Sequence, residues 1–299
     1  MPGNTTVARY GIGELYGFDF SSLPPSKIRA LSTANHRKTP CPFRPMVGKA
    51  RPNCSKKGGV CSLREYTVKQ PDEVVPLGLP VTTCPRRFLE GDLVKGWVGE
   101  TILGTQQPIA LSEIPFLMSA DDGTEKNAEV GQIDTVLVKS SQEPLHWCAL
   151  EMQAVYFSGA SMENDLRVMR RWRGPGIPFP PAHRHPDFRS SGPKRLMPQL
   201  QVKVPTISRW GKKMAVVVDK AFWDSLGRMR EARDVSNSDI AWFVVNYVPG
   251  KGGAFSLTKH SVHYTTLDQA VEGLTGGTPM SLVRFEGVIR ERLRRLSTS

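Results

Sequence analysis

The strongest constraint on the fold is a pair of short apolar segments, residues 131–138 and 145–156, that flank the sequence Ser-Ser-Gln-Glu-Pro. Both segments have the composition of β-strands, and the polar residues and proline between them are typical of a turn. A hairpin centred on that turn brings Asp134 directly opposite Glu151. A β-bulge would shift this register by one residue and separate the pair.

Asp134, Glu151 and Gln153 share one face of this hairpin, because side chains alternate between faces along a strand. Carboxylate and amide oxygens suit a hard divalent cation, and such a cation can activate water for attack on a phosphodiester. Acidic residues on strands are usually solvated edge residues. These two carboxylates, however, lie in apolar strands, where a charge needs a partner or a metal ion. Cys148 falls on the opposite face and is expected in the core.

Four of the five cysteines lie close together in a segment rich in Pro, Gly, Lys and Arg: Cys41, Cys54, Cys61 and Cys84. They are separated by 12, 6 and 22 residues, which does not match the commonest zinc patterns. Loops of this composition bury little apolar surface and need a cross-link or a metal to fold. The sequence shows no secretory signal, so disulfides are not expected. We expect a four-thiolate site for iron or zinc, with four ordinary reduced cysteines as the alternative.

Positive charge is concentrated in one part of the chain. The net charge is +12, and residues 160–230 alone carry 15 Lys or Arg against 5 Asp or Glu. Such clustering is the expected footprint of a polyanion such as DNA, and a solvated basic surface is the alternative. Residues 37–87 form a second basic block, which contains the four cysteines. No apolar run reaches membrane-spanning length, so we expect no membrane contact and a cytoplasmic protein.

The rest of the sequence predicts alternating helices and strands. Segment 108–118 has the pattern of a strand interrupted at Pro115, with Glu113 among its apolar residues, and residues 174–198 predict an irregular loop. Hydrophobic periodicity predicts helices at 86–104, 220–232, 266–274 and 280–296, and strands at 200–208, 213–218 and 240–248. This order favours an α/β fold with a mixed central sheet flanked by helices.

Together these features resemble the PD-(D/E)xK superfamily of nucleases, in which an Asp on one strand and a Glu-x-Lys on the next bind magnesium. Asp134 matches the first position and Glu151 the second, whereas Gln153 stands where the superfamily has lysine. More narrowly, the chain resembles the NotI family of restriction endonucleases, whose members combine a four-cysteine iron site with a Glu-x-Gln active site. The resemblance extends from about Cys41 to Tyr156.

The resemblance implies a domain organisation. A PD-(D/E)xK nuclease core would occupy residues 88–299 and would include residues 160–230 as a basic DNA-recognition stretch. A four-cysteine metal-binding module would precede it at 37–87. Residues 1–36 form an N-terminal segment whose role the sequence does not reveal.

The resemblance also implies an activity, that of a prokaryotic type II restriction endonuclease in a restriction-modification system. A homodimer would cut both strands of double-stranded DNA at a specific, GC-rich palindrome. Asp134 and Glu151 would hold Mg²⁺, Gln153 would orient or polarise the attacking water, and Glu113 is the candidate for a further catalytic glutamate of the family. The side chains expected to contact DNA are Arg167, Arg170, Arg171, Arg173, Arg184, Arg189, Lys194 and Arg195.

Two other classes of protein remain open. One is a non-catalytic, metal-stabilised DNA-binding protein in which the hairpin acids are incidental, and the other is a metal-stabilised assembly protein with a protein or RNA partner. Glu100 and Glu129 are alternatives to Glu113. The sequence does not give the recognition sequence, the cut position, the methylation sensitivity, the number of catalytic metals or the choice between iron and zinc.

Overall fold

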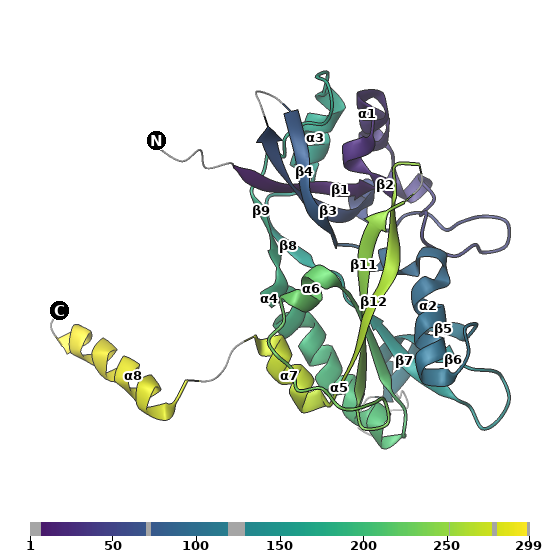
Figure 1. The fold of residues 1–299 in the computed structure, drawn as a ribbon, viewed down its shortest axis with the longest axis vertical. Coiled ribbons are helices and arrows are strands. Elements are labelled where there is room, and N and C mark those ends of the chain that lie inside the picture. Colours follow the sequence, from purple (N-terminus) through teal and green to yellow (C-terminus); the bar gives the residue numbers. More distant parts are fainter. Residues whose placement is uncertain (1–6, 70–72, 119–128, 251, 277–279, 298–299) are drawn as a thin grey trace.

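A six-stranded mixed sheet forms the centre of the molecule (Figure 1). The computed structural model describes residues 7–69, 73–118, 129–250, 252–276 and 280–297. The strand order is β12-β11-β10-β7-β6-β5. The strands are β5 (Ile109–Met118), β6 (Glu129–Val138), β7 (Trp147–Met152), β10 (Met214–Asp219), β11 (Ile240–Pro249) and β12 (Phe255–Thr265). Strands β7, β10 and β11 are parallel and the other neighbours are antiparallel, which confirms the predicted mixed sheet.

The hairpin formed by β6 and β7 has the register that the sequence predicts. Thr135 pairs with Leu150, and Val136 pairs with Ala149. Continued by one residue, the same register sets Asp134 opposite Glu151. Cys148 is fully buried in the apolar cluster on the other face of the sheet, as expected.

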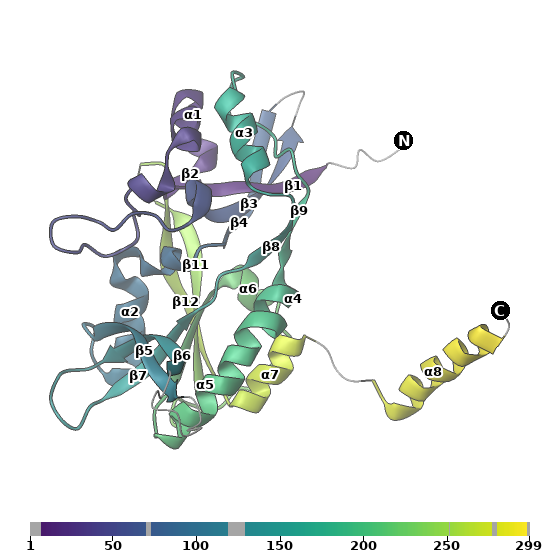
Figure 2. The same cartoon turned by 180° about the vertical axis from the view of Figure 1, so that it is seen from behind.

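Helices cover both faces of this sheet and give the molecule three layers (Figures 1 and 2). On one face, α5 (Met197–Arg209), α6 (Lys220–Asp224) and α7 (Leu267–Thr275) contribute to a cluster centred on Val216 and Trp242. On the other, α2 (Leu93–Val98) and the flanking helical turns Pro85–Asp92 and Gly99–Leu103 pack on Phe243 and Leu150. Side chains on both faces of β10 and β11 are buried, as expected of parallel strands that helices cover on both sides.

A smaller sheet of four strands, ordered β2-β1-β3-β4, lies beyond one end of the large sheet (Figure 1). Its strands are β1 (Ala8–Leu15), β2 (Phe18–Asp19), β3 (Val60–Lys69) and β4 (Glu73–Thr82). Helices α1 (Pro25–Thr33) and α3 (Glu163–Arg171) lie side by side next to it (Figures 1 and 2). Because β1 pairs with β3, the N-terminal segment and the cysteine-containing segment share one sheet.

Two buried carboxylates join the small sheet to the large one. Glu14 of β1 accepts a hydrogen bond from Arg87 at 3.0 Å, and Arg87 also donates to the carbonyl of Phe255 in β12. Asp219, at the end of β10, accepts from the backbone N–H of Thr82 at 2.6 Å and of Phe222 at 2.8 Å. Buried charges are retained where every oxygen finds a donor, so these contacts fix the position of the small sheet.

One predicted strand is wrong. Residues 200–208 belong to helix α5, although the sequence Gln-Val-Lys-Val imitates the alternation of a strand. Leu200, Val204 and Ile207 follow helical spacing and are buried against the sheet. Packing of that stripe against the core outweighs the low helix propensity of valine and threonine.

Other boundaries also differ from expectation. The helix predicted at 220–232 ends at Asp224. The stretch 174–198 contains β9 (Arg184–Asp187), which pairs with β8 (Tyr156–Gly159), then α4 (Phe188–Ser191) and a helical turn, Gly192–Leu196, that leads into α5. Strand β5 continues through Pro115, because an edge strand tolerates a missing N–H, and its register shifts after that residue.

The predicted helices at 266–274 and 280–296 are confirmed as α7 and α8 (Leu282–Ser297). Helix α8 lies apart from the body of the molecule in both views (Figures 1 and 2). In the part of the chain that the structure describes, no helix combines the length and the apolar character needed to cross a membrane.

Candidate active site

Asp134 and Glu151 converge on a single positive charge, the ammonium group of Lys203. Its Nζ atom lies 2.7 Å from Oε2 of Glu151 and 3.5 Å from Oδ1 of Asp134. Glu151 and Lys203 are buried, whereas the side chain of Asp134 is 63% exposed. The two carboxylates therefore meet at a point that is enclosed on the Glu151 side and open to solvent on the Asp134 side.

Lys203 is a site residue that the sequence analysis missed. It lies on α5 between Leu200 and Val204, on the stripe that faces the sheet, and its Nζ atom also donates to Oε1 of Gln199 at 3.1 Å. A lysine inside the apolar stripe of a helix is the signal that could have revealed it, because such a residue needs a charged partner. Because residues 200–208 were predicted to form a strand, the helical stripe was not recognised.

Gln153 lies just beyond the end of β7, where the chain leaves the sheet. Its backbone N–H donates to Val217 in β10 at 2.9 Å, and the carbonyl of Thr82 accepts the N–H of Val155. Its buried side chain donates from Nε2 to the carbonyl of Ala154 at 2.6 Å. The backbone of residues 153–155 is therefore held between β10 and the end of β4.

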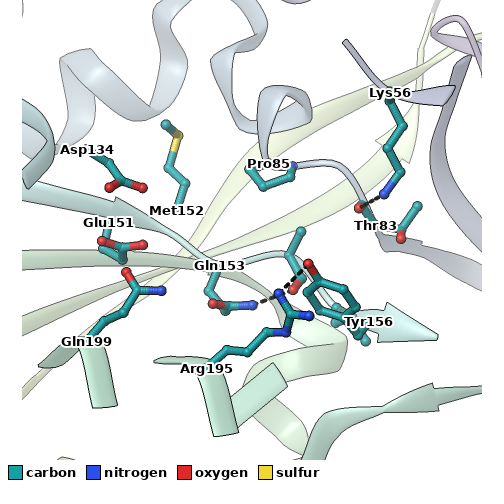
Figure 3. Close-up of a pocket in the computed structure, with 12 residues that line it drawn as sticks. Lys56, Thr83, Pro85, Asp134, Glu151, Met152, Gln153, Tyr156, Arg195 and Gln199 are labelled. Atoms are coloured by element: carbon teal, nitrogen blue, oxygen red, sulfur yellow. Dashed lines mark hydrogen bonds between the residues drawn. The ribbon is translucent and has the colours of Figure 1, made fainter. Parts of the chain in front are cut away.

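A pocket of about 320 Å³ opens over this point, and its walls include Asp134, Glu151, Gln153 and Gln199 (Figure 3). Across the pocket lie Lys56 and Tyr156, with Arg195 beneath them in the view of Figure 3. A second pocket of about 610 Å³ is also lined by Asp134 and Lys56, together with Glu113, Arg44 and Arg86. The two pockets adjoin, because they share Lys56, Pro85, Asp134 and Met152 as lining residues. Together they are called the groove, and both acidic and basic side chains line it.

Glu113 belongs to the second pocket and lies opposite Asp134 in the β5–β6 register. Ser112 pairs with Thr135 and Ile114 pairs with Ile133, which sets Glu113 across from Asp134. Its backbone is left-handed, with φ of 56°, a conformation that non-glycine residues adopt at a cost and that occurs often at functional sites. Positions 113, 134 and 151 thus form a row across three adjacent strands, although in the described part of the chain their carboxylates do not come together as a three-ligand metal site.

Glu100 and Glu129 are the alternatives to Glu113 as the further catalytic glutamate. Glu100 is exposed and contacts Gln106 at 2.8 Å and Lys259 at 3.4 Å, and it lines neither pocket. The side chain of Glu129 lies outside the described part of the structure. Of Glu113 and Glu100, whose side chains the structure describes, Glu113 lines the groove.

Burial controls the electrostatics of Glu151. It raises the pKa of the Glu151 carboxyl above its ordinary value, the ammonium of Lys203 opposes this, and the neighbouring Asp134 carboxylate reinforces it. A buried carboxylate that faces a second carboxylate gains from any added positive charge. The pair is therefore suited to a cation.

The four clustered cysteines are all buried in one apolar cluster with Tyr16 and Phe43. Burial raises the pKa of the Cys54 and Cys84 thiols, and the charge of Cys41 adds to both shifts. The thiols are therefore close enough to interact. In the described residues, however, no three His, Cys, Asp or Glu side chains have the arrangement of a metal site, so the structure shows the cluster and no ligand geometry.

The expected DNA-contacting residues fall into two groups. Arg184 is buried and contacts both oxygens of Asp165, at 2.9 and 2.5 Å, so its guanidinium holds β9 against α3. This removes it from the expected set, because a guanidinium that is paired and enclosed offers no donor to DNA. Arg170 is half-buried and contacts Glu163 and the carbonyl of Ser32. The exposed members are Arg167, Arg171, Arg173, Arg189, Lys194 and Arg195.

Arg195 reaches the groove from the turn that precedes α5. Its guanidinium carbon lies 3.5 Å from the centre of the Tyr156 ring, and Nη1 donates to the Tyr156 hydroxyl at 2.6 Å (Figure 3). Stacking leaves the outer edge of a guanidinium available for an anion. Arg195 therefore presents its charge beside Gln153.

The class of protein follows from comparison with known families. A family model described as "Restriction endonuclease NotI" matches residues 26–257, so the protein is a restriction endonuclease, a hydrolase that cuts double-stranded DNA at specific sites. The chain belongs to the NotI family. A search of the curated proteins finds none that matches it.

Proposed function

We propose that the protein hydrolyses phosphodiester bonds of double-stranded DNA with Mg²⁺ bound between Asp134 and Glu151. The observation that supports this is the convergence of both carboxylates on one buried ammonium group, at 2.7 and 3.5 Å, in the wall of a groove that both carboxylates line. Two carboxylates that already share one positive charge fit a divalent cation, which prefers oxygen ligands. Bound there, Mg²⁺ would lower the pKa of water and offset charge on the phosphate.

The chain's own residues would orient the reactants. Glu113, across from Asp134, would accept a hydrogen bond from a water molecule or complete the cation site. Gln153 is neutral and can orient an attacking water only through its amide. Arg195 and Lys56 line the pocket away from the two carboxylates and would contact the phosphates on either side of the scissile phosphate.

We propose a homodimer as the active form, because a two-fold axis relates the two strands of a palindrome. The exposed basic side chains of 160–230 would supply phosphate contacts and read guanine edges of a GC-rich site. Residues 88–299 would act as the nuclease core with a PD-(D/E)xK active site. The enzyme would work in the prokaryotic cytoplasm beside a methyltransferase that protects the host DNA.

A structural iron or zinc ion is proposed for Cys41, Cys54, Cys61 and Cys84. All four cysteines are buried in one cluster, which fits a thiolate site. Burial disfavours ionised thiols in the metal-free protein, so metal binding must release protons. The ion would tie residues 37–59 to β3 and to the start of the turn at Pro85.

Cleavage of GC-rich genomic DNA tests the proposed function. The wild-type protein with Mg²⁺ should give discrete fragments whose ends share one sequence, and EDTA should abolish cleavage. Asp134→Asn and Glu151→Gln should bind DNA with Ca²⁺ but cut at least about 100-fold more slowly.

The result that would favour a non-catalytic DNA-binding protein is equally specific. In that case the wild-type protein would bind duplex DNA with strong salt dependence, would leave it intact with Mg²⁺ or Mn²⁺, and the two variants would behave as the wild type does.

A further inference from the structure

We propose that Lys203 is the built-in cation of the active site. When no divalent cation is bound, its ammonium holds Asp134 and Glu151 together. It therefore competes with the divalent cation for these two carboxylates. Once the cation has bound, the positive charge of Lys203 supports phosphodiester cleavage. This inference rests on the proposed function and assigns to the site a positive charge that its strand residues do not supply.

The first support is the direction of the ammonium group. A lysine has three N–H donors and no acceptor, and three oxygens surround Nζ of Lys203. They belong to Glu151 at 2.7 Å, Gln199 at 3.1 Å and Asp134 at 3.5 Å. Both carboxylates that would ligate a divalent cation are thus already in contact with Lys203. A cation that enters must displace it from at least one of them.

The second support is the position of Lys203 on its helix. It lies among Leu200, Val204 and Ile207, on the face of α5 that packs on the sheet, and its side chain is 7% exposed. An apolar residue at such a position is often as stabilising as a buried ion pair or more so. A lysine is therefore poorly explained by packing, whereas its charge has a use beside two carboxylates and a phosphate.

The third support is that Gln153 cannot supply this charge. Its side chain is neutral and already donates to the carbonyl of Ala154 at 2.6 Å. Arg195 is charged but lies against Tyr156. Among the described residues, Lys203 is the cation that contacts both carboxylates. Negative charge grows on the phosphate oxygens during cleavage, so a fixed positive charge at this point lowers the barrier.

The two roles give effects of opposite sign in the variant Lys203→Met. Without the competing ammonium, the full-length protein should bind Mn²⁺ more tightly in the absence of DNA, by on the order of tenfold, since the carboxylates lose their internal partner. The single-turnover rate of cleavage at saturating DNA should fall about 100-fold. Titration calorimetry measures the first quantity and rapid quench the second.

A residue with only a structural role would behave differently. Loss of order around Glu151 would weaken Mn²⁺ binding and slow cleavage together. Weaker or unchanged Mn²⁺ binding in Lys203→Met, or cleavage within threefold of wild type, therefore overturns the inference. If that variant fails to fold, Lys203→Gln, which keeps a hydrogen-bond donor without the charge, gives the same test.

A second test moves the positive charge from position 203 to position 153. Gln153 lines the same pocket as Glu151 and lies two residues further along the chain. The double variant Gln153→Lys, Lys203→Met places an ammonium on the groove wall in place of the buried one and should recover at least about tenfold of the lost rate. No recovery in a double variant that folds and binds DNA would count against a role for the charge.

The matched control is Lys95→Gln. Lys95 also pairs with a carboxylate, Asp92, at 3.0 Å, but it lies on α2 and lines neither pocket. Its Mn²⁺ affinity and cleavage rate should equal those of wild type. A different result would refute the proposed function itself: wild-type protein that does not cut DNA, or Glu151→Gln that cuts at the wild-type rate. The inference on Lys203 fails on its own when Glu151 is essential and Lys203 is not.

Discussion

Nζ of Lys203 lies 2.7 Å from Oε2 of Glu151, although 52 residues separate the two in the chain. The contact joins helix α5 to strand β7 and brings a positive charge to the enclosed side of the carboxylate pair. Both side chains are buried, so each depends on the other for compensation.

The stability of the protein should therefore depend on both partners together. Lys203→Met leaves Glu151 buried without a partner and should lower the free energy of unfolding by about 3 kcal/mol. The double variant Lys203→Met, Glu151→Gln should regain more than half of that loss, because the remaining amide carries no charge. Urea unfolding in EDTA measures both values. Additive losses in the double variant would show that the pair is not coupled.

Glu113 and Glu100 provide a paired test of the catalytic row. Glu113→Gln should slow cleavage by about 100-fold, because Glu113 faces Asp134 in the groove. Glu100→Gln should leave the rate unchanged, since Glu100 contacts Lys259 and Gln106 outside both pockets. Single-turnover cleavage with Mg²⁺ is the measurement. The reverse order of effects would exclude Glu113 from the site.

Metal content should follow the cysteine cluster and not the core cysteine. Elemental analysis of the purified protein should find iron or zinc, and Cys84→Ser should lose it. Cys148→Ala should keep it, because Cys148 is buried on the far side of the active-site hairpin. Metal-free wild-type protein, or full retention in Cys84→Ser, would argue against the four-thiolate site.

Arg184 should matter for folding and Arg189 for DNA. Arg184→Leu removes the partner of a buried Asp165 carboxylate and should cost about 3–5 kcal/mol of stability. Arg189→Leu, at an exposed position, should change stability by less than about 0.5 kcal/mol and should weaken DNA binding at low salt. Thermal unfolding and a fluorescence-anisotropy titration distinguish the two. Equal stability of the two variants would contradict the buried role of Arg184.

Asp219 should give the stability a specific pH dependence. Burial raises the pKa of its carboxyl above the ordinary value of 3.8, although the N–H groups of Thr82 and Phe222 oppose the shift. The folded protein then binds more protons than the unfolded chain above pH 3.8. The contribution of Asp219 to stability is present below that pH and is lost as the pH rises through the folded-state pKa.

The difference in unfolding free energy between wild type and Asp219→Asn should accordingly fall as the pH rises from about 4. Urea unfolding across the acid range measures it. A difference that grows with pH would mean that the two N–H donors outweigh burial.

The sequence predicted the active-site hairpin well because that information is local. The alternation of β6 and β7 and the turn between them determine which residues face each other, so the pairing of Asp134 with Glu151 and the burial of Cys148 follow from pattern alone. The NotI resemblance rested on the hairpin residues and on the four clustered cysteines, and the family match over residues 26–257 extends beyond them.

Lys203 was missed because its role depends on tertiary packing. Its nearest carboxylate comes from a strand 52 residues earlier, and the valines around it imitate strand alternation. Arg184 was misassigned for a related reason: a basic stretch does not reveal which guanidinium turns inward to a buried Asp165. The helical spacing of Leu200, Val204 and Ile207 was the available signal for Lys203, whereas the spacing of residues around Arg184 gives no comparable signal.

The join between the two sheets also bears on how the enzyme is inactivated. Residues 153–155 lie between Val217 of the large sheet and Thr82 of the small one, and Lys56 and Pro85 from the cysteine-containing segment line the same groove as Glu151. A shift of the small sheet would widen that groove while the six-stranded core stays folded. On heating, cleavage activity should therefore be lost at a temperature several degrees below the midpoint of global unfolding.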